Sequence, residues 1–466
     1  MKTMTVASSW TDLNGRRLDS RPYHSGAVES RVLLEKLPVR KRKLIDVTEN
    51  ENGIFNGPRF ARMYVENPEF GIPFLGSTDI LLSDLSMLPL LSKKYVANHP
   101  ELLIDNGWTL ITCSGTIGRM AYARPEMKNM TGSQHFMRVV PDLNKIKPGY
   151  LYSYLSSRFG LPMIIGMTYG AIIQHIEPYH IADLPVPDLG DVEEKSHQLC
   201  ADAAIMRTEA TKRFNRAGEI INNAFGFPHK IAFSARNYSI TSTSSFVARS
   251  RLEATYHDWV AKKSDELLGQ VVSSDILGKI AATGETGRIK QIFVEKRYGV
   301  PFLTSGDLFL LRLDPERFLS KKLLPVDESW KILEGDILIA RSGQVGGIIG
   351  HCVWADKRFE DLCVSVDVLR LRAKKGEILP GYLFAYLNLT DVGYRQLIRT
   401  AAGSSIPHLS PNDVALLRVP RTDDATEKII NDLVFEAGQL RADAQEKEDA
   451  ARLLVEDAIE ELANHG

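Results

Sequence analysis

The sequence repeats itself once along the chain, at an offset of 228 to 233 residues. The run Gly71 to Leu75 (GIPFL) returns as Gly299 to Leu303 (GVPFL), and the Ser-Gly-x-x-Gly run that begins at Ser114 returns at Ser342. The later matches keep the same order: Pro148 to Leu151 with Pro380 to Leu383, Gly170 with Gly403, His175 with His408, and Pro187 with Pro420. Chance does not produce such an ordered series, so we infer an internal duplication in which both copies fold on one plan.

Length and charge limit the classes of protein to consider. The 466 residues predict two to four domains, and 44% hydrophobic with 25% charged residues is typical of a globular protein. With 57 Lys and Arg against 58 Asp and Glu, the net charge of -1 excludes a uniformly basic nucleic-acid coat and an acidic tail protein. It does not exclude DNA binding, because the placement of the charges decides that.

The cysteines and the hydropathy indicate where such a chain works. Its four cysteines are scattered without close pairs, which favours reduced thiols over a disulfide framework or a zinc site. No apolar run follows the first lysine, and no window approaches the roughly 18 apolar residues of a membrane span. We therefore expect a soluble, cytoplasmic protein that has no membrane partner.

Each copy is predicted to mix short strands with helices. Apolar runs rich in β-branched residues indicate strands over 108–113, 336–340 and 363–371. Helices are predicted over 148–159 and 380–394, where Pro148 and Pro380 suit the first turn.

A long helix is predicted after each copy, over 191–226 and 422–466. Asp191 with Glu194, and Asp424 with Glu427, have the spacing of capping boxes at the two starts. Apolar residues recur in steps of three and four on otherwise charged segments, which indicates a narrow seam on each helix. The two seams are expected to pack against each other through Leu199, Met206, Phe214 and Ile221 from the first helix and Leu433, Leu440, Leu454 and Leu462 from the second.

These helices divide the chain into four predicted segments. The first globular domain covers 1–190 and the second covers 227–421, in which the Ser- and Thr-rich stretch 227–250 is expected to link the copies. The globular segments carry charges of +3 and +6, the helix over 191–226 carries -1, and that over 422–466 carries -9. A DNA duplex would repel the last segment, so we expect it to face away from DNA, toward the other helix and partner proteins.

No catalytic residue or metal ligand is predicted. The sequence has no phosphate-binding loop of the GxxxxGK[ST] type, no GxSxG elbow, and no clustered Cys and His spacing for a metal. Asp188, followed by Glu193, Glu194 and Lys195, superficially resembles a metal-dependent nuclease motif. The spacing is too short for separate strands, and acidic residues at a helix start favour the helix dipole.

The two Ser-Gly-x-x-Gly runs are candidate DNA contacts. Glycines after a strand permit close approach of the backbone to a phosphate, and polar side chains there can donate to phosphates or bases. An ordinary glycine-rich hairpin turn is the alternative interpretation. The candidate residues are Ser114, Thr116 and Arg119 in the first copy and Arg341, Ser342 and Gln344 in the second.

Further candidates lie only in the first copy. Arg40, Lys41, Arg42 and Lys43 form a basic run that either follows a DNA backbone or is a solvated turn. Gln134, His135 and Arg138, which flank a strand in the first copy, are candidate base contacts. His175 and His408, which repeat between the copies, are interpreted as structural.

Taken in order, the motifs resemble the specificity subunit of type I restriction–modification systems over nearly the whole chain. They are G-[IV]-P-F-L, Ser-Gly-x-x-Gly, Pro-Gly-Tyr-Leu, Gly-x-x-x-x-His, Leu-x-x-Pro and a long helix, each found twice. The resemblance implies an α+β chain with two tandem target recognition domains, separated by two long helices that pair as an antiparallel coiled coil. Each domain would read one half of a bipartite DNA sequence, and the helices would set the spacer between the halves.

The resemblance also implies partners. Catalysis would belong to a DNA adenine methyltransferase subunit, usually in two copies, that uses S-adenosylmethionine, and to an ATP-dependent restriction and translocase subunit that needs Mg. This chain would bind double-stranded DNA and no cofactor. Related DNA modification or phage-defence complexes use the same module, so the type of system stays open.

Two other functional classes stay open. One is a duplicated metal-dependent nuclease or hydrolase without a recognised motif. The other is a repeat-built scaffold or inhibitor that does not bind DNA.

Overall fold

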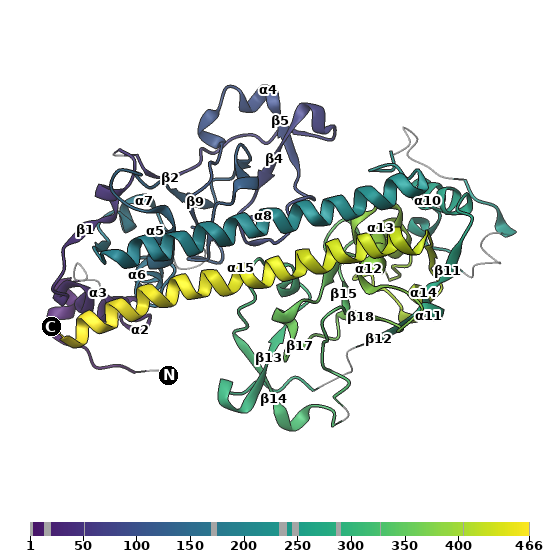
Figure 1. The fold of residues 1–466 in the computed structure, drawn as a ribbon. Coiled ribbons are helices and arrows are strands. Elements are labelled where there is room, and N and C mark those ends of the chain that lie inside the picture. The colour runs from purple at the N-terminus through teal and green to yellow at the C-terminus, as the bar shows by residue number, and fades with distance from the viewer. Residues whose placement is uncertain are drawn as a thin grey trace. The chain divides into compact units, whose positions relative to one another are not determined.

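The computed structural model describes residues 3–13, 20–50, 52–168, 175–232, 240–244, 251–285, 290–326, 328–403 and 405–465 (Figure 1). The chain divides into two compact units. Unit 1 comprises Met1–Thr208 and Asp443–Gly466, and unit 2 comprises Glu209–Ala442. Among the described residues, none of the helices combines the length and the apolar character that a membrane span needs.

Unit 1 is an α+β structure. Its helices are α1 (Ser8–Leu13), α2 (Arg21–His24), α3 (Ala27–Lys36), α4 (Lys93–Val96), α5 (Pro148–Leu155), α6 (Gly160–Gly166) and α7 (Pro178–Ile181). Its strands are β1 (Lys41–Lys43), β2 (Ile54–Asn56), β3 (Tyr64–Val65), β4 (Gly71–Leu75), β5 (Leu90–Ser92), β6 (Thr109–Thr112), β7 (Met120–Tyr122), β8 (Thr131–Gly132), β9 (Phe136–Val139) and β10 (Pro185–Pro187). They form sheets in the orders β2-β9-β6-β7, β3-β5-β4-β8 and β1-β10.

Unit 2 repeats this plan. Its helices are α10 (Trp259–Gly269), α11 (Leu277–Ile280), α12 (Pro380–Leu389), α13 (Asp391–Ile398) and α14 (Pro411–Ala415). Its strands are β11 (Ser274–Ile276), β12 (Ala281–Glu285), β13 (Gly299–Leu303), β14 (Arg317–Ser320), β15 (Ile337–Ala340), β16 (Cys352–Trp354), β17 (Cys363–Val364), β18 (Val368–Ala373) and β19 (Arg418–Pro420). The sheets β12-β18-β15-β16 and β11-β19 have the strand orders of β2-β9-β6-β7 and β1-β10, and β14-β13-β17 matches β5-β4-β8 but has no counterpart of β3. This repeated topology agrees with the predicted duplication, and the α+β fold class is confirmed.

Two predicted elements of the second copy are each interrupted. The strand predicted over 363–371 is two strands, β17 and β18, separated by the turn Ser365 to Asp367. The helix predicted over 380–394 breaks at Thr390, whose hydroxyl accepts a hydrogen bond from Gly393 N and caps α13. The apolar pattern continues through both breaks because the flanking residues are buried on either side. In the first copy, α5 ends at Leu155, four residues before the predicted end.

The Pro-Gly-Tyr-Leu motif begins a helix that packs on the short strand pair of its unit. In unit 1 this is α5 on β1-β10, and in unit 2 it is α12 on β11-β19. Tyr150 OH donates to the carbonyl of Pro187, and Tyr154 OH donates to that of Pro185. The matching bonds in unit 2 run from Tyr382 OH to Pro420 O, at 2.6 Å, and from Tyr386 OH to Arg418 O, at 3.1 Å. These four tyrosines are almost fully buried, so each hydroxyl finds inside the protein the partner that burial demands.

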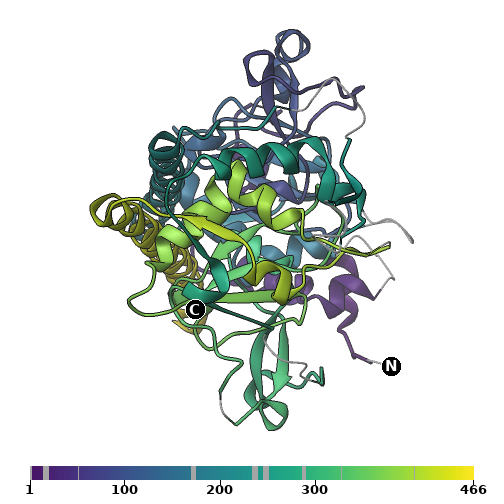
Figure 2. The same cartoon turned by 90° about the vertical axis from the view of Figure 1, so that its right-hand side faces the viewer.

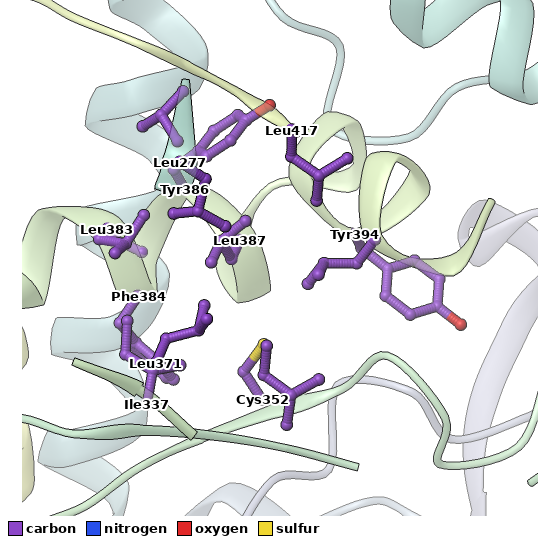
Figure 3. Packing of buried hydrophobic residues seen from close by; sticks show 14 of the residues in the cluster. Leu277, Ile337, Cys352, Leu371, Leu383, Phe384, Tyr386, Leu387, Tyr394 and Leu417 are labelled. Atoms are coloured by element: carbon purple, nitrogen blue, oxygen red, sulfur yellow. The ribbon is translucent and has the colours of Figure 1, made fainter. Parts of the chain in front are cut away.

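The other face of this helix packs on the four-stranded sheet of the same unit. In unit 2, Leu383 and Leu387 of α12 point toward Ile337 and Leu371 of the sheet (Figure 3), and all four are fully buried. Burial of such side chains contributes about 1.5–3 kcal/mol each. The matching core of unit 1 contains Leu151 and Leu155 of α5 against Ile111 and Met137. All four cysteines are free and buried, in agreement with the sequence interpretation.

The two long helices are α8 (Asp191–Phe225) and α15 (Asp424–His465), and both run through the two units. Within unit 1, Lys447 Nζ lies 3.1 Å from Asp202 Oδ2, and within unit 2, Arg213 Nε lies 3.0 Å from Glu436 Oε2. Each of these pairs joins α8 to α15 inside one unit. Figure 2 shows teal α8 beside yellow α15, in agreement with Figure 1.

The buried face of each long helix is wider than the narrow seam predicted. Phe214 and Ile221 are buried as expected, whereas Leu199 and Met206 are only partly covered. On α15 the predicted Leu433, Leu440, Leu454 and Leu462 are partly buried, whereas the fully buried residues include the nearby Ile430, Val434, Val455 and Ile459. The reason is that α15 packs on the core of each unit as well as on α8, which requires a broad apolar stripe.

The capping residues at the helix starts also differ from the prediction. Before α15, Asp423 accepts from Thr426 N at 2.9 Å and Glu427 accepts from Thr422 N at 3.2 Å, one residue earlier than the expected cap at Asp424. Before α8, Glu193 accepts from Leu189 N at 3.0 Å. Glu194 pairs with Lys147 instead, which takes it away from the backbone.

A glycine allows α5 to approach α8 closely in unit 1 and α12 to approach α15 closely in unit 2. A Cβ on Gly149 would lie 2.7 Å from the Cα and the carbonyl oxygen of His197 in α8, and one on Gly381 would lie 2.8 Å from the carbonyl oxygen of Asn431 in α15. The same long-helix residues accept the glycine N–H groups, at 3.1 Å for Nδ1 of His197 and 3.0 Å for Oδ1 of Asn431. The repeated glycine is therefore a packing requirement.

Replacing either glycine by alanine tests this requirement. Gly149→Ala and Gly381→Ala are each expected to destabilise their unit by about 1–3 kcal/mol, because backbone atoms must shift to admit the methyl group. Gly269→Ala is the control, since no heavy atom lies within 4 Å of its added Cβ. Thermal unfolding midpoints measure the effect, and a midpoint for Gly381→Ala no lower than that of the control would contradict this close approach.

The ion pair between Arg207 and Glu448 joins the long helices inside unit 1. Both side chains are about 5% exposed, and Tyr152 OH also donates to the Glu448 carboxylate. A buried pair of this kind is weak evidence of net stabilisation, but removal of one partner leaves a buried charge without its counterion.

Glu448→Ala is expected to destabilise unit 1 by about 3–5 kcal/mol for this reason. Glu436→Ala, which removes the partner of the more exposed Arg213, is the matched control and is expected to change stability by less than about 1 kcal/mol. Urea unfolding of both variants makes the comparison. Equal losses would show that burial of the Arg207–Glu448 pair is of no consequence.

Candidate nucleic-acid interface

The Ser-Gly-x-x-Gly run of unit 1 forms the closed turn between β6 and β7. Gly115 and Gly118 have φ values of 76° and 84°, which favour glycine, and Gly118 N donates to Thr112 O at 3.0 Å. The Thr112 hydroxyl donates to Thr116 O and accepts from Arg119 N at 3.0 Å. The backbone of the turn is thus held from within, and the side chains of Thr116 and Arg119 are exposed at its tip.

The matching run in unit 2 begins a connection between β15 and β16 that is four residues longer, and Gly350 N, not Gly346 N, donates to Ala340 O, at 2.9 Å. Gly343 and Gly346 have φ values of 142° and 88°, and Gly347 N donates to Gln344 O at 2.9 Å. Gln344 is exposed, at the position that Thr116 occupies in the first copy. Of the candidate residues in the two runs, Thr116, Arg119 and Gln344 are exposed, whereas Ser114, Arg341 and Ser342 are partly buried.

Three loops meet at the residue before the repeated serine, through the same backbone hydrogen bonds in both units. Cys113 N donates to His135 O at 3.1 Å, and Ile176 N donates to Cys113 O at 3.1 Å. In unit 2, Arg341 N donates to Asp367 O at 2.8 Å, and Leu409 N donates to Arg341 O at 2.9 Å. We call these three loops the loop cluster of each unit: 114–119, 133–135 and 175–176 in unit 1, and 342–347, 365–367 and 405–409 in unit 2.

The repeated serine binds the middle loop through its side chain. Ser114 Oγ lies 2.8 Å from Nδ1 of His135, and Ser342 Oγ donates to Oδ1 of Asp367 at 2.7 Å. His135 and Asp367 occupy matching places, so the same contact is made with a different chemistry. These serines hold the loops together, which gives them a structural role that the sequence did not indicate.

The residues beside these contacts also differ between the copies. Gln134 is partly buried, and its Nε2 lies 3.1 Å from Nε2 of His135, whereas Val366 occupies its place in unit 2. Arg341 donates from Nε to Leu409 O at 3.1 Å, so its guanidinium joins two loops of the cluster. Cys113 stands at that position in unit 1.

His175 and His408 form backbone bridges to the repeated serines, in agreement with a structural role. Gly170 lies outside the described residues.

Two arginines that the sequence patterns did not indicate, Arg59 and Arg62, lie near enough to the loop cluster of unit 1 to lower the pKa of His135. The pKa of His135 is lowered, first by partial burial and then by the positive charges of Arg62, His175 and Arg59. Arg59 and Arg62 are exposed, and the guanidinium carbon of Arg62 lies 5.1 Å from the ring centre of Phe74. Their interleaving with aromatic residues in the run Arg59 to Tyr64 is a signal that could have identified them.

The prediction that Arg138 contacts bases is wrong. Its side chain is fully buried, and its guanidinium donates to the carbonyls of Gly132, Ser133 and Phe136 at 2.8 to 3.2 Å. Burial lowers the pKa of Arg138 to about 10. This arginine holds the turn between β8 and β9, a role that a flanking position in the sequence does not reveal.

Most of the basic run is engaged in the structure of unit 1. Lys41 Nζ donates to Leu37 O at 2.7 Å, Arg42 pairs with Asp188 at 2.6 Å, and Lys43 pairs with Asp183 at 2.9 Å. Arg40 is exposed. The structural alternative is therefore favoured for Lys41, Arg42 and Lys43.

A charge reversal between the copies supports the structural role of the Arg42–Asp188 pair. At the matching positions of unit 2, Asp275 pairs with Arg421 at 2.6 Å, with the acid and the base exchanged. Both pairs join the short strand pair to the chain that leads into a long helix. A contact with DNA phosphates would not tolerate this exchange.

The acidic residues that superficially resemble a nuclease motif are also engaged within unit 1. Asp188 pairs with Arg42, Glu193 accepts from Leu189 N, and Glu194 pairs with Lys147. A search of the described residues finds no group of three or more His, Cys, Asp or Glu placed to hold a metal ion.

The environment of His135 gives a testable titration. Replacing Arg62 by Gln removes a nearby positive charge, so the pKa of His135 is expected to rise toward the usual value of about 6.5. Because the folded-state pKa lies below the unfolded value, the contribution of His135 to stability is complete above about pH 6.5 and declines as the pH falls below it.

NMR titration of the His135 ring measures the shift. Arg119→Gln, on the adjacent turn, is the control, because Arg119 is not among the charges that lower this pKa. An unchanged titration of His135 in Arg62→Gln would refute the electrostatic contact.

No protein-family model matches the chain, and no curated protein sequence matches it. It is similar to the S subunit of a type I restriction-modification system from M. genitalium, with 13% identity and a TM-score of 0.36 over 92% of this chain and 96% of that chain. It is also similar to an HsdS subunit from Thermoanaerobacter tengcongensis, with 14% identity and a TM-score of 0.27 over 91% of this chain and 97% of that one.

A further similar chain belongs to a type I R-M system whose complex assembly and conformational transition were studied. It has 14% identity and a TM-score of 0.28, over 91% of this chain and 98% of that chain. The solved structures to which the chain is similar thus include S subunits, the family that its sequence motifs resemble. At these identities and TM-scores, the similarity assigns no residue a role.

Proposed function

We propose that this chain is the sequence-specific DNA-binding subunit of a type I restriction–modification complex or a related DNA modification or phage-defence complex. It recognises a bipartite target, one half-site per recognition domain, and directs methyltransferase and restriction subunits to that target. The observation that carries the proposal is that the loop clusters share the backbone hydrogen bonds around Cys113 and Arg341 and differ in the side chains that they carry. In the alignment of the two copies, His135 corresponds to Asp367, Gln134 to Val366, and Thr116 to Gln344.

This combination is what the recognition of two different half-sites requires. A shared framework presents the loops in the same way to two duplexes of the same shape, whereas different tips form different hydrogen bonds with base edges. The exposed Thr116, Arg119 and Gln344 carry the groups that such contacts use. Arg59 and Arg62 join them as candidate phosphate contacts in unit 1. We propose the recognition domains with the bounds expected from the sequence, 1–190 and 227–421. Parts of the expected linker 227–250 lie outside the described residues.

The long helices α8 and α15 serve as the spacer in this proposal. Their ion pairs and buried faces make them stiff, so their length would set the number of base pairs between the half-sites. The charge of -9 over 422–466, from 13 acidic and 4 basic residues, would repel DNA. The exposed acidic surface of α15 is therefore left for partner subunits.

The partners supply the chemistry. A DNA adenine methyltransferase subunit, in two copies, would use S-adenosylmethionine, and an ATP-dependent restriction and translocase subunit would use ATP and Mg. The chain itself is proposed to be non-catalytic and to bind no cofactor. These assignments rest on the resemblance of the sequence motifs.

Lengthening the helices tests the proposal. Seven residues inserted after Thr208 in α8 and seven after Ala442 in α15 oppose each other in the register set by Asp202–Lys447 and Arg213–Glu436. Seven helical residues add about 10 Å, so the gap between the protected half-sites should grow by about three base pairs while the half-site sequences stay the same. Footprinting of the chain with its methyltransferase subunit measures both.

Seven residues added after Asn464, at the exposed end of α15, provide the control and should leave the gap unchanged. A single continuous footprint, or altered half-site bases, would contradict the spacer role. Hydrolysis of DNA by the isolated chain with a divalent metal would favour the nuclease alternative. A chain that binds its partners but no DNA would favour the scaffold.

A further inference from the structure

Four consecutive residues are identical in the two copies and are not part of the loop clusters. Leu91 to Lys94 and Leu319 to Lys322 both read Leu-Ser-Lys-Lys, at the offset of 228 residues. Packing explains the leucines, because Leu91 is fully buried and Leu319 is 1% exposed. It does not explain the lysines, which are exposed in both units.

The lysine pairs occupy the same place in the two folds. Ser92 pairs with Gly71 at the start of β4, and Ser320 pairs with Gly299 at the start of β13, so each lysine pair follows directly at that end of the strand pair. Figure 1 shows the β4–β5 region of unit 1 and the β13–β14 region of unit 2 as lobes that extend from the long-helix segments of their own unit. The lysines therefore lie on an outlying part of each unit.

The stability of the fold does not depend on two adjacent lysines after β5 or β14. Lys93 Nζ donates to Glu69 O at 2.7 Å in unit 1. Within the described part of unit 2, the ammonium groups of Lys321 and Lys322 make no hydrogen bond or ion pair. Substitution of exposed side chains of this kind normally changes stability by less than about 0.5 kcal/mol. The surrounding surface has diverged, since Pro68 and Glu69 of unit 1 correspond to Lys296 and Arg297 of unit 2.

We propose that the two Leu-Ser-Lys-Lys lysine pairs bind the phosphate backbone of the DNA duplex, one pair on each half-site, without reading sequence. Residues that are identical in both copies cannot distinguish two different half-sites, but phosphates are the same in every duplex. The lysine ammonium is a point charge that suits phosphate oxygens. Lys296 and Arg297 at the same end of the strand pair add positive charge in unit 2.

This inference rests on the proposed DNA-binding function and adds to it a set of sequence-independent contacts. Each phosphate contact contributes about 0.9 to the slope of log affinity against log salt concentration. Lys93→Gln with Lys94→Gln, and Lys321→Gln with Lys322→Gln, are therefore each expected to lower the slope by about 2. The affinity should fall by the same factor for a duplex that carries the target and for one that does not.

Titration of the full-length chain with both duplexes, at a series of salt concentrations, measures the slopes. Lys374→Gln with Lys375→Gln is the charge-matched control, because this exposed lysine pair has no counterpart in the first copy, where Asp142 and Leu143 stand. Lys374 Nζ already donates to the carbonyls of Gly278 and Lys279, at 2.9 and 2.7 Å. Unchanged thermal midpoints verify that all three variants fold. The control should keep the wild-type slope.

The outcomes separate this inference from the proposed function. If the wild-type chain prefers its target and the lysine variants keep its slope, the lysine assignment fails and the proposed function stands. A slope that falls equally in the control variant also overturns the assignment, because net charge alone would then explain it. If variants with unchanged slopes lose a partner subunit, the lysines bind protein. If the wild-type chain binds no duplex, both proposals fail.

Discussion

The close approach of a short helix to a long one organises each unit. Gly149 and Gly381 bring α5 and α12 against backbone atoms of α8 and α15, respectively, and the tyrosines of the same helices bind the short strand pair. The apolar face of each short helix then covers the four-stranded sheet whose turns carry the loop cluster. One short helix thus connects the long helix, the strand pair and the sheet, so the position of the loops depends on a contact that tolerates no side chain.

The duplication separates the side chains that support the fold from those that vary on it. The backbone hydrogen bonds around Cys113 and Arg341 are the same in both units, although the two side chains have nothing in common. Arg42 with Asp188 and Asp275 with Arg421 fill one structural position with opposite charges. Exposed residues that differ, such as Thr116 and Gln344, are free to carry specificity, and exposed residues that are identical, such as the paired lysines, are free to carry what both halves share.

Sequence patterns predicted most elements because burial and turn geometry leave periodic traces. The turns at Ser114 and Ser342 were recognisable from glycines that adopt positive φ, and the long helices from their repeating apolar residues. The patterns failed where two elements share one apolar run, as at Ser365 to Asp367 and at Thr390. The buried face of α15 is wider than the predicted seam because a heptad pattern indicates one packing partner, whereas Ile430 and Val434 also contact the core of their unit.

By itself, the sequence determined the duplication, the α+β class, the two long helices and the places of the glycine-rich turns. These follow from local propensity and from residue order, which need no knowledge of distant contacts. Only the tertiary structure decided that Arg138 is buried under three carbonyls, that Arg42 belongs to an ion pair, and that Arg59 and Arg62 act on His135. The sequence alone does not show whether a charged side chain is exposed to solvent or bound to another residue of the chain. The partner is set by segments far apart in the chain that the fold brings together.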